Sequence, residues 1–227
     1  MDTLIPIIVA WMVMFFSAIL VLLVAKVFSF SKEITGSLML VAILGNTSFM
    51  GIPIVNAYMG ESAIPYVLVY DQLGTFIALA IYGTFIASYY SSKNQITFKI
   101  ITLKVLTFPP FISLVAALFL MGVEFNPILS KVLASFSSTI VPMALVAVGL
   151  QLQFKLPKED LKPFSIALVI KLIIAPIFAI IICKIFSWDN EVSVVSIMES
   201  AMAPMITAGA IAAMAGLAPR LSSAIVG

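Results

Sequence analysis

Three ionisable side chains lie inside long apolar stretches of the sequence, where a charge is costly. Asp71 and Glu199 carry carboxyl groups, and Lys171 carries an amine. Ionisable residues at membrane depth are rare and usually functional. A carboxyl group there can bind a cation or carry a proton, so Glu199 and Asp71 are candidates for ion or proton coupling. Lys171 is a candidate partner for a substrate carboxylate; alternatively, it forms a structural ion pair with Asp71 or Glu199, or reaches the aqueous interface.

A second group of residues combines polar side chains with helix breakers. Asn46, Thr47 and Ser48 are followed by Gly51 and Pro53 inside one apolar stretch. Proline removes a main-chain donor, and hydrocarbon offers no water to the freed groups, so a break there must be buried in protein or line a wet cavity. The three polar side chains are candidates for substrate binding; alternatively, they cap the second half of the broken helix.

A third group repeats this combination near the end of the chain. Pro204 and Gly209 are the predicted helix breakers, and Thr207 is the polar candidate for substrate binding. Two interrupted spans in corresponding halves of a chain are typical of the binding site of a secondary transporter. The amino ends of broken helices favour anions, and their carboxyl ends favour cations. Two ordinary proline kinks are the alternative interpretation.

The composition is that of an integral membrane protein. Of 227 residues, 63% are hydrophobic and 10% are charged, whereas soluble domains are about 45–50% apolar and about 25% charged. The formal net charge of +2 gives no reason to expect a nucleic acid as partner. The sequence has no histidine and a single cysteine, Cys183. No disulfide within the chain and no histidine-based metal or catalytic site is therefore expected.

Eight apolar segments divide the chain, and seven of them reach the roughly 20 residues that span a bilayer as a helix. These seven cover residues 4–30, 34–59, 63–90, 100–123, 127–152, 163–186 and 192–215. The second and seventh contain the breaks. The eighth, residues 217–227, is too short to span, and we expect the chain to end inside a helix. The sequence thus predicts an all-α membrane protein with seven full spans and a partial eighth.

Basic residues indicate the orientation. When they are assigned to alternating sides of the spans, nine fall on one face and two on the other, and the twelfth, Lys171, lies within a span. The first face receives Lys26, Lys32, Lys93, Lys99, Lys104, Lys155, Lys158, Lys162 and Arg220, and the second receives Lys131 and Lys184. Lysine and arginine favour the cytoplasmic side. We therefore expect a multi-pass protein of the plasma or inner membrane with its first residue outside and its basic loops in the cytoplasm.

A short pattern occurs twice. Residues 26–34, KVFSFSKEI, match residues 184–192, KIFSWDNEV, and five crossings separate the copies, which gives them opposite topology. Chance is the alternative, but the match predicts an inverted repeat. Residues 1–91 would then hold the last three helices of the first repeat, residues 92–99 a cytoplasmic linker, and residues 100–227 the second repeat, truncated in its last helix. Two further helices are expected ahead of Met1 in the complete protein.

The first broken span resembles the Asn-x-x-Phe-x-Gly-x-Pro signature of the auxin efflux carrier family, with Asn46, Phe49, Gly51 and Pro53 at the signature positions. Residues 144–151, ALVAVGLQ, and the second broken span fit the same family, which includes bacterial malate and malonate carriers. The resemblance implies ten helices in two inverted five-helix repeats, with the fourth and ninth helices broken and crossing at the substrate site. This chain would cover the third to ninth helices and the start of the tenth.

Glu199 and Ser200 are also similar to a Glu-Thr or Glu-Ser pair in the related bile acid:sodium symporters, where the glutamate binds sodium. Ala203 stands where those symporters have glutamine, so the full sodium site of the symporters is not reproduced.

These patterns together predict a secondary active transporter, a permease or efflux carrier, of small organic anions such as carboxylates. It would work by alternating access with the substrate at the crossing, driven by an H⁺ or Na⁺ gradient through symport or antiport. No cofactor is expected beyond that coupled ion, and the expected partners are the lipid bilayer and the substrate, with a homodimer compatible. The pair Tyr70-Asp71 is similar to one in intramembrane aspartyl proteases, but no Gly-x-Gly-Asp accompanies it, so no enzyme activity is expected. A non-transporting membrane scaffold or receptor subunit is the alternative.

Overall fold

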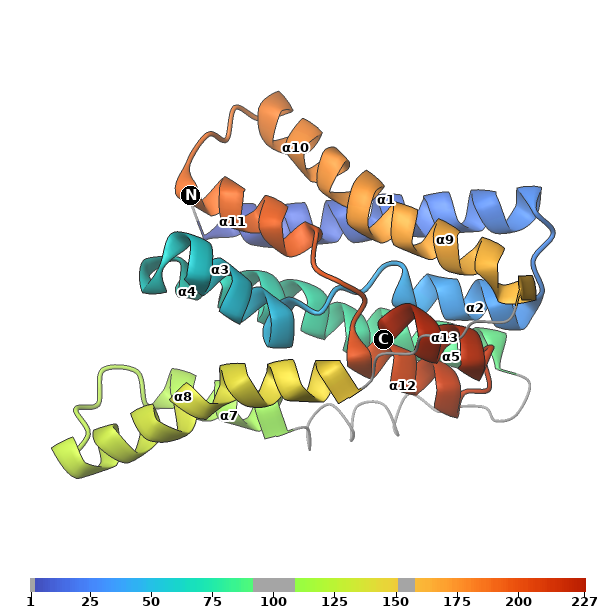
Figure 1. The fold of residues 1–227 in the computed structure, drawn as a ribbon. Helices are drawn as coiled ribbons and strands as arrows, with labels where there is room; N and C mark the ends of the chain where they lie inside the picture. Colours follow the sequence, from blue (N-terminus) through green and yellow to red (C-terminus); the bar gives the residue numbers. More distant parts are fainter. Residues whose placement is uncertain (1–2, 92–108, 151–157) are drawn as a thin grey trace.

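The computed structural model describes residues 3–91, 109–150 and 158–227 (Figure 1). Throughout these ranges the regular structure is helical, and the β-type pairing within them is one isolated bridge between Gly45 and Pro204. The predicted all-α class is therefore confirmed. The predicted linker and the first residues of the fourth apolar segment lie outside the described residues.

Within the described part of the chain, three uninterrupted helical stretches are long and apolar enough to cross a membrane. The first is α1 (Leu4–Val27). The second, Glu61–Tyr90, contains η2 (Glu61–Ala63), α4 (Ile64–Val69), η3 (Tyr70–Phe76), η4 (Leu79–Gly83) and α5 (Thr84–Tyr90). The third, Lys158–Ile185, contains η5 (Lys158–Asp160), α9 (Leu161–Val169), η6 (Ile170–Ile174) and α10 (Ala175–Ile185).

Both spans that were predicted to break are broken. In the first, α2 (Lys32–Val41) is separated from η1 (Thr47–Gly51) and α3 (Ile52–Met59). In the second, α11 (Glu191–Ser200) is separated from α12 (Ile206–Met214). Figure 1 shows the two non-helical links passing one another at the centre of the molecule. The remaining helices are α7 (Pro109–Phe119), α8 (Pro127–Leu150) and α13 (Pro219–Val226).

Three of the predicted helix breakers lie after the observed breaks in the sequence, inside the helices that follow. The first link covers residues 42–46, so Gly51 lies within η1 and Pro53 within α3. The π-type turn of η1, in which Gly51 N donates to Asn46 O, changes the hydrogen-bond register just before Pro53, so that the helix continues through the proline. Gly209 lies inside α12, where a Cβ would approach Val226 Cγ2 of α13 to 2.6 Å. Gly209 therefore permits close helix packing, and of the predicted breakers only Pro204 lies in a link.

The two copies of the sequence pattern form the same turn. At the end of α1, Ser29 has φ 51°, Ser29 N donates to Lys26 O, and Phe30 N donates to Ala25 O. At the end of α10, Ser187 has φ 53° and the equivalent bonds run to Lys184 O and Cys183 O. This pair of bonds with a left-handed residue is the Schellman motif. Each turn leads directly into a ten-residue half-helix, α2 or α11.

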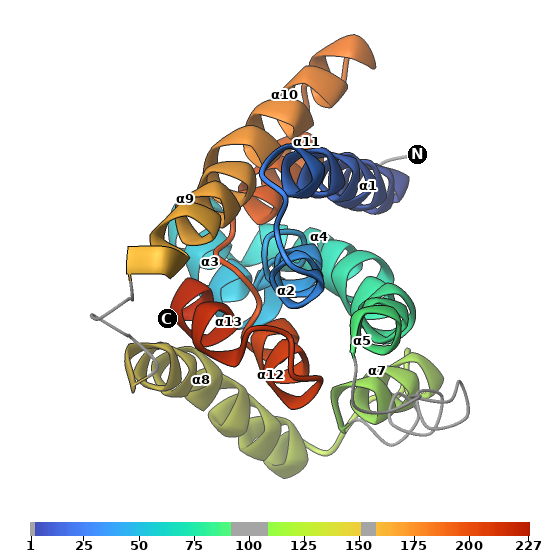
Figure 2. The same ribbon diagram turned by 90° about the vertical axis from the view of Figure 1, so that its right-hand side faces the viewer.

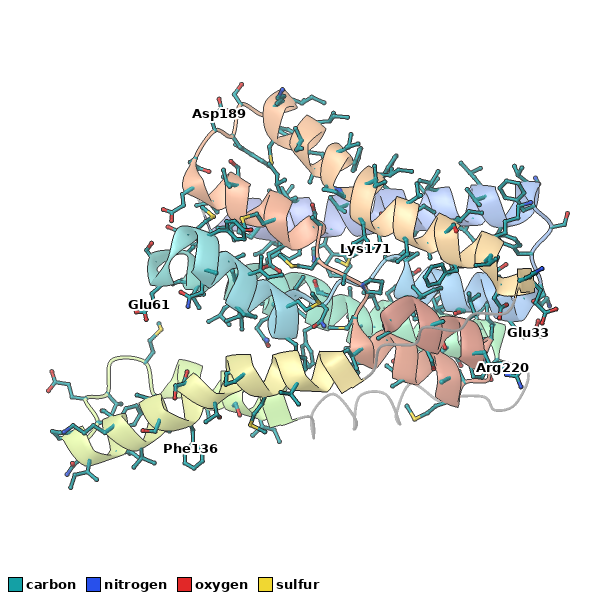
Figure 3. The ribbon with its side chains drawn as sticks, viewed as in Figure 1. Glu33, Glu61, Phe136, Lys171, Asp189 and Arg220 are labelled. Atoms are coloured by element: carbon teal, nitrogen blue, oxygen red, sulfur yellow. The ribbon has the colours of Figure 1, made fainter. Side chains whose placement is uncertain are left out.

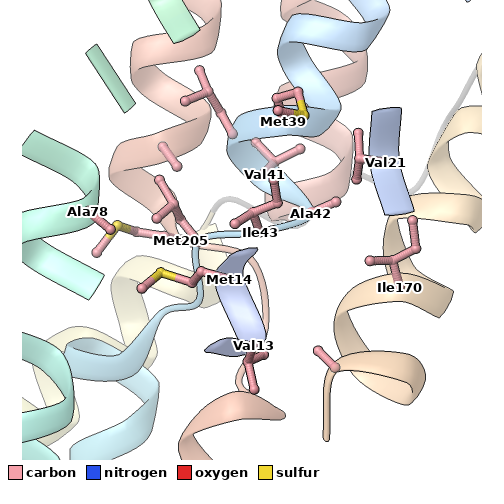
Figure 4. Packing of buried hydrophobic residues seen from close by; sticks show 14 of the residues in the cluster. Val13, Met14, Val21, Met39, Val41, Ala42, Ile43, Ala78, Ile170 and Met205 are labelled. Carbon is pink, nitrogen blue, oxygen red and sulfur yellow. The ribbon is translucent and has the colours of Figure 1, made fainter. Parts of the chain in front are cut away.

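Buried apolar side chains pack around part of the crossing links. Figure 4 shows Ile43 and Met205, from the two links, packed with Met14 of α1. On the outside, large apolar side chains are exposed; Phe15 is 71% exposed and Ile185 is 71% exposed. Exposed apolar surface on long helices is suited to lipid. In the end-on view of Figure 2, α7 and α8 lie at the periphery, on the side away from α1 and α10.

Candidate functional site

The two broken spans are hydrogen-bonded to each other at their breaks. Asn46 N donates to Ala203 O over 2.7 Å, and Met205 N donates to Leu44 O over 2.9 Å. These bonds flank the antiparallel pair of Gly45 and Pro204. Pro204 has no N–H group to donate, but the pairing does not need one, because its two hydrogen bonds are donated by Asn46 and Met205. The pairing satisfies main-chain groups that the breaks remove from helices, which a membrane interior requires.

Asp71 joins the first broken span to the neighbouring unbroken one. It lies in η3 and is 1% exposed. Its Oδ1 accepts hydrogen bonds from Thr47 Oγ1 at 2.5 Å and Ser48 Oγ at 2.6 Å, and its Oδ2 accepts one from Gln72 Nε2 at 2.6 Å. Three donors use much of the capacity of one carboxylate. The hydroxyl hydrogens of Thr47 and Ser48 are therefore committed to Asp71.

The carboxyl group of Glu199 differs from that of Asp71 in its hydrogen bonding. It lies in the last turn of α11 and is fully buried, and neither carboxyl oxygen has a hydrogen-bond partner among the described residues. The carboxyl group lies against the main chain of Gly51, where an added Cβ would be 2.5 Å from both oxygens. Gly51 is thus the residue that makes room for Glu199. A buried, ionised and unpaired carboxylate is costly, so Glu199 is the group at the crossing with capacity for a cation or a proton.

Lys171 lies in η6 and is 3% exposed, so it does not reach the aqueous interface. Figure 3 shows it in the interior, whereas the other charged residues labelled there lie at the periphery. Its Nζ donates to the main-chain oxygen of Ser200 at 3.1 Å and lies beside Gly45, where an added Cβ would be 2.8 Å away. No hydrogen bond joins it to the carboxyl group of Glu199, although its acceptor Ser200 is the residue after Glu199.

The remaining candidates lie at the amino ends of the second half-helices. Asn46 is 2% exposed and directly precedes η1, and its main-chain oxygen accepts from Met50 N and Gly51 N. Thr207 is half-buried in the first turn of α12. The structure therefore brings Thr47 and Ser48 of the first break together with Asp71. It places Glu199 against Gly51, and Lys171 between Gly45 and the carboxyl end of α11.

Two roles near the breaks were not predicted from the sequence. Gly45, which directly precedes Asn46, forms the bridge and allows Lys171 close to the main chain. Tyr82 donates from its hydroxyl to Met39 O at 2.9 Å, near the carboxyl end of α2. A glycine directly before the Asn46 cluster was a usable signal for the break. Tyr82 gave no such signal, because its hydroxyl donates to a main-chain oxygen, and the pattern of side chains in a sequence does not show main-chain contacts.

Comparison with known proteins identifies the family of the chain. A family model described as membrane transport protein matches residues 1–227. An uncharacterized transporter of Methanocaldococcus jannaschii is 28% identical over 202 residues, covering 87% of this chain and 64% of that protein. An uncharacterized transporter of Methanothermobacter thermautotrophicus is 23% identical over 184 residues, covering 78% of this chain and 58% of that protein. The chain thus spans less than two thirds of either relative. The predicted family resemblance is confirmed, and the chain belongs to the membrane transport protein family.

Proposed function

We propose that the protein is a secondary carrier of small organic anions, such as carboxylates, whose substrate binds at the crossing of the two broken spans. The observation that carries the proposal is the hydrogen-bonded pairing of the breaks at Gly45 and Pro204. A break in one helix has several explanations, but two breaks that pair bring four helix ends to one place. Such ends supply main-chain groups for both an anion and a cation.

The anion would bind at the amino ends of η1 and α12. Both helices begin just after the bridged residues Gly45 and Pro204. The free N–H groups at the start of a helix favour negative charge. The Asn46 amide and the Thr207 hydroxyl are the side-chain donors proposed for the substrate. Thr47 and Ser48 would act differently: because their hydrogens point to Asp71, they support the helix start and offer only oxygen lone pairs to a ligand.

The buried charges support coupling to a cation. Asp71, Glu199 and Lys171 are all buried, and when all three are ionised their charges sum to −1. An anionic substrate adds further negative charge, which is costly at membrane depth. One proton or Na⁺ at Glu199 would neutralise the trio, so an inward gradient of that ion would favour loading of the substrate. Asp71, which already has three donors, would chiefly position η1.

Alternating access would follow from an inverted repeat. The matching turns at Ser29 and Ser187 and the equal lengths of α2 and α11 support this proposal beyond the sequence match. We propose that the spans lie in the plasma or inner membrane with the first residue outside, and that one helical bundle moves against the crossed pair. A homodimer is compatible with this arrangement.

Flux into proteoliposomes tests the proposal. Labelled malonate, malate and an indole acid are offered with H⁺ or Na⁺ gradients, each with and without ionophore. We expect uptake of at least one that collapses when the gradient is removed. Asn46→Ala and Glu199→Gln should abolish uptake while expression is retained. Wild-type protein that is folded and yet gives no gradient-dependent uptake of any small carboxylate would favour a non-transporting scaffold or receptor subunit.

A further inference from the structure

Each first half-helix is capped near its carboxyl end by a side chain from an unbroken span. Tyr82 Oη donates to Met39 O of α2, and Lys171 Nζ donates to Ser200 O of α11. The two caps differ in charge. A helix carboxyl end carries about half a negative charge, which an ammonium group compensates and a neutral hydroxyl does not. The α11 end therefore carries a fixed cation, and the α2 end does not.

The surroundings of Lys171 explain why a positive charge is needed there. Glu199, one residue before Ser200, is fully buried and its carboxyl oxygens have no hydrogen-bond partner in the described part of the chain; Asp71 is buried on η3. The neighbouring Tyr70 is buried as well. The carbonyl groups of Met198 and Glu199 accept from Ala201 N and Met202 N, whereas that of Ser200 is bound by the lysine. The ammonium thus binds the main-chain oxygen of the residue that follows the buried Glu199. Main-chain oxygens and carboxylates are also the groups that bind metal cations.

We propose that Lys171 is a resident cation: its ammonium holds the position at the carboxyl end of α11 that a mobile cation would otherwise occupy. This role replaces pairing with a substrate carboxylate and makes Lys171 a positioning residue. This inference rests on the proposed function in one respect: with Lys171 fixed at the carboxyl end of α11, the coupled ion of the proposed carrier would bind at Glu199. One mobile cation, not two, would then accompany each cycle through this end of the site.

Chemical rescue provides the test. Lys171→Ala removes three carbons and the amine, which are the heavy atoms of n-propylammonium, and leaves a space of that shape. Lys171→Met fills the space without charge. We expect the Ala variant in detergent to have a lower Tm than wild type. At about ten times its Kd, propylammonium should raise that Tm by roughly 3–6 °C.

Four controls separate charge from packing. Propylammonium should not raise the Tm of wild type, of Lys171→Met, or of Lys184→Ala, which removes an exposed lysine from the last turn of α10. n-Propanol, which has the length without the charge, should not rescue Lys171→Ala. Equal shifts in all variants, or rescue by propanol as large as by the amine, would overturn the proposal.

If Lys171→Ala does not fold, acetylation of wild-type lysines gives a second test. In the folded protein, Lys171 should resist acetylation under conditions that modify Lys184, and equal labelling would overturn the proposal. The thermal test is also independent of transport. Amine rescue together with no wild-type flux would remove the proposed function and leave the resident cation standing, whereas wild-type flux without rescue would do the reverse.

Discussion

Replacing Gly51 with alanine should displace the carboxyl group of Glu199. The new Cβ would lie 2.5 Å from both carboxyl oxygens and 2.8 Å from Cδ. Non-bonded carbon contacts are normally about 3.5 Å or longer, so the carboxyl group must retreat by roughly 1 Å. Glu199 is fully buried, so its carboxyl group can move only if the packing around it changes. The substitution therefore changes the position of the group proposed to hold the coupled ion.

The cost can be estimated from comparable changes. Overpacking a buried site by one methyl group costs about 1–3 kcal/mol, while alanine in place of glycine within a helix gains up to about 1 kcal/mol. Gly83→Ala is the matched control, because its Cβ would meet Leu79 Cδ1 at 3.4 Å and two other leucines at 3.7 Å, which are ordinary contacts. Gly51→Ala should therefore be less stable than Gly83→Ala by about 1–3 kcal/mol.

Thermal unfolding in detergent measures this difference, which corresponds to roughly 5 °C for a chain of this length. A double-mutant cycle isolates the contact: Glu199→Asp shortens the acid by one methylene group, so Gly51→Ala should cost less in that background. Gradient-driven uptake should fall in Gly51→Ala and remain in Gly83→Ala. If both glycine variants have the same Tm and the effects in the cycle are additive, the predicted clash between a Cβ at position 51 and the Glu199 carboxyl group does not occur.

Three further substitutions are followed by thermal unfolding. Thr47→Val removes a donor to the buried Asp71 carboxylate and should cost about 1.5–3 kcal/mol, the range for hydrogen bonds to charged groups. Tyr82→Phe removes the bond to Met39 O and should cost about 0.5–1.5 kcal/mol, as a neutral bond does. Ser187→Gly relieves a left-handed residue at φ 53° and should stabilise by roughly 1 kcal/mol. An unchanged Tm in any one of them would contradict the corresponding contact or conformation.

Much of the site was predictable because charge and helix breakers are conspicuous in an apolar chain. Asp71, Lys171 and Glu199 stand out since each is costly where it lies, and all three are buried as expected. The two breaks were predicted from Pro204 and from the residues around Asn46. Their meeting was inferred from the recurrence of the pattern, and the bridge between Gly45 and Pro204 bears that out.

The roles within the site were less predictable, because they depend on which atoms meet. Gly51 was expected to break a helix, but it lies within η1 and leaves space for Glu199. Lys171 was expected to bind a substrate carboxylate, to pair with Asp71 or Glu199 or to reach the interface, and its Nζ donates to the main-chain oxygen of Ser200. Every residue has a main-chain oxygen, so the sequence does not show which one accepts a hydrogen bond from a side chain. It also does not distinguish a glycine that permits close packing from one that ends a helix.

A cryo-EM map of the complete protein in lipid, with malonate or malate bound, shows directly whether the substrate binds where the broken spans cross. We expect paired breaks at Gly45 and Pro204, with carboxylate density at the starts of η1 and α12, near Asn46 and Thr207. Breaks that lie apart in the bilayer, or a ligand bound elsewhere while the crossing stays empty, would contradict it.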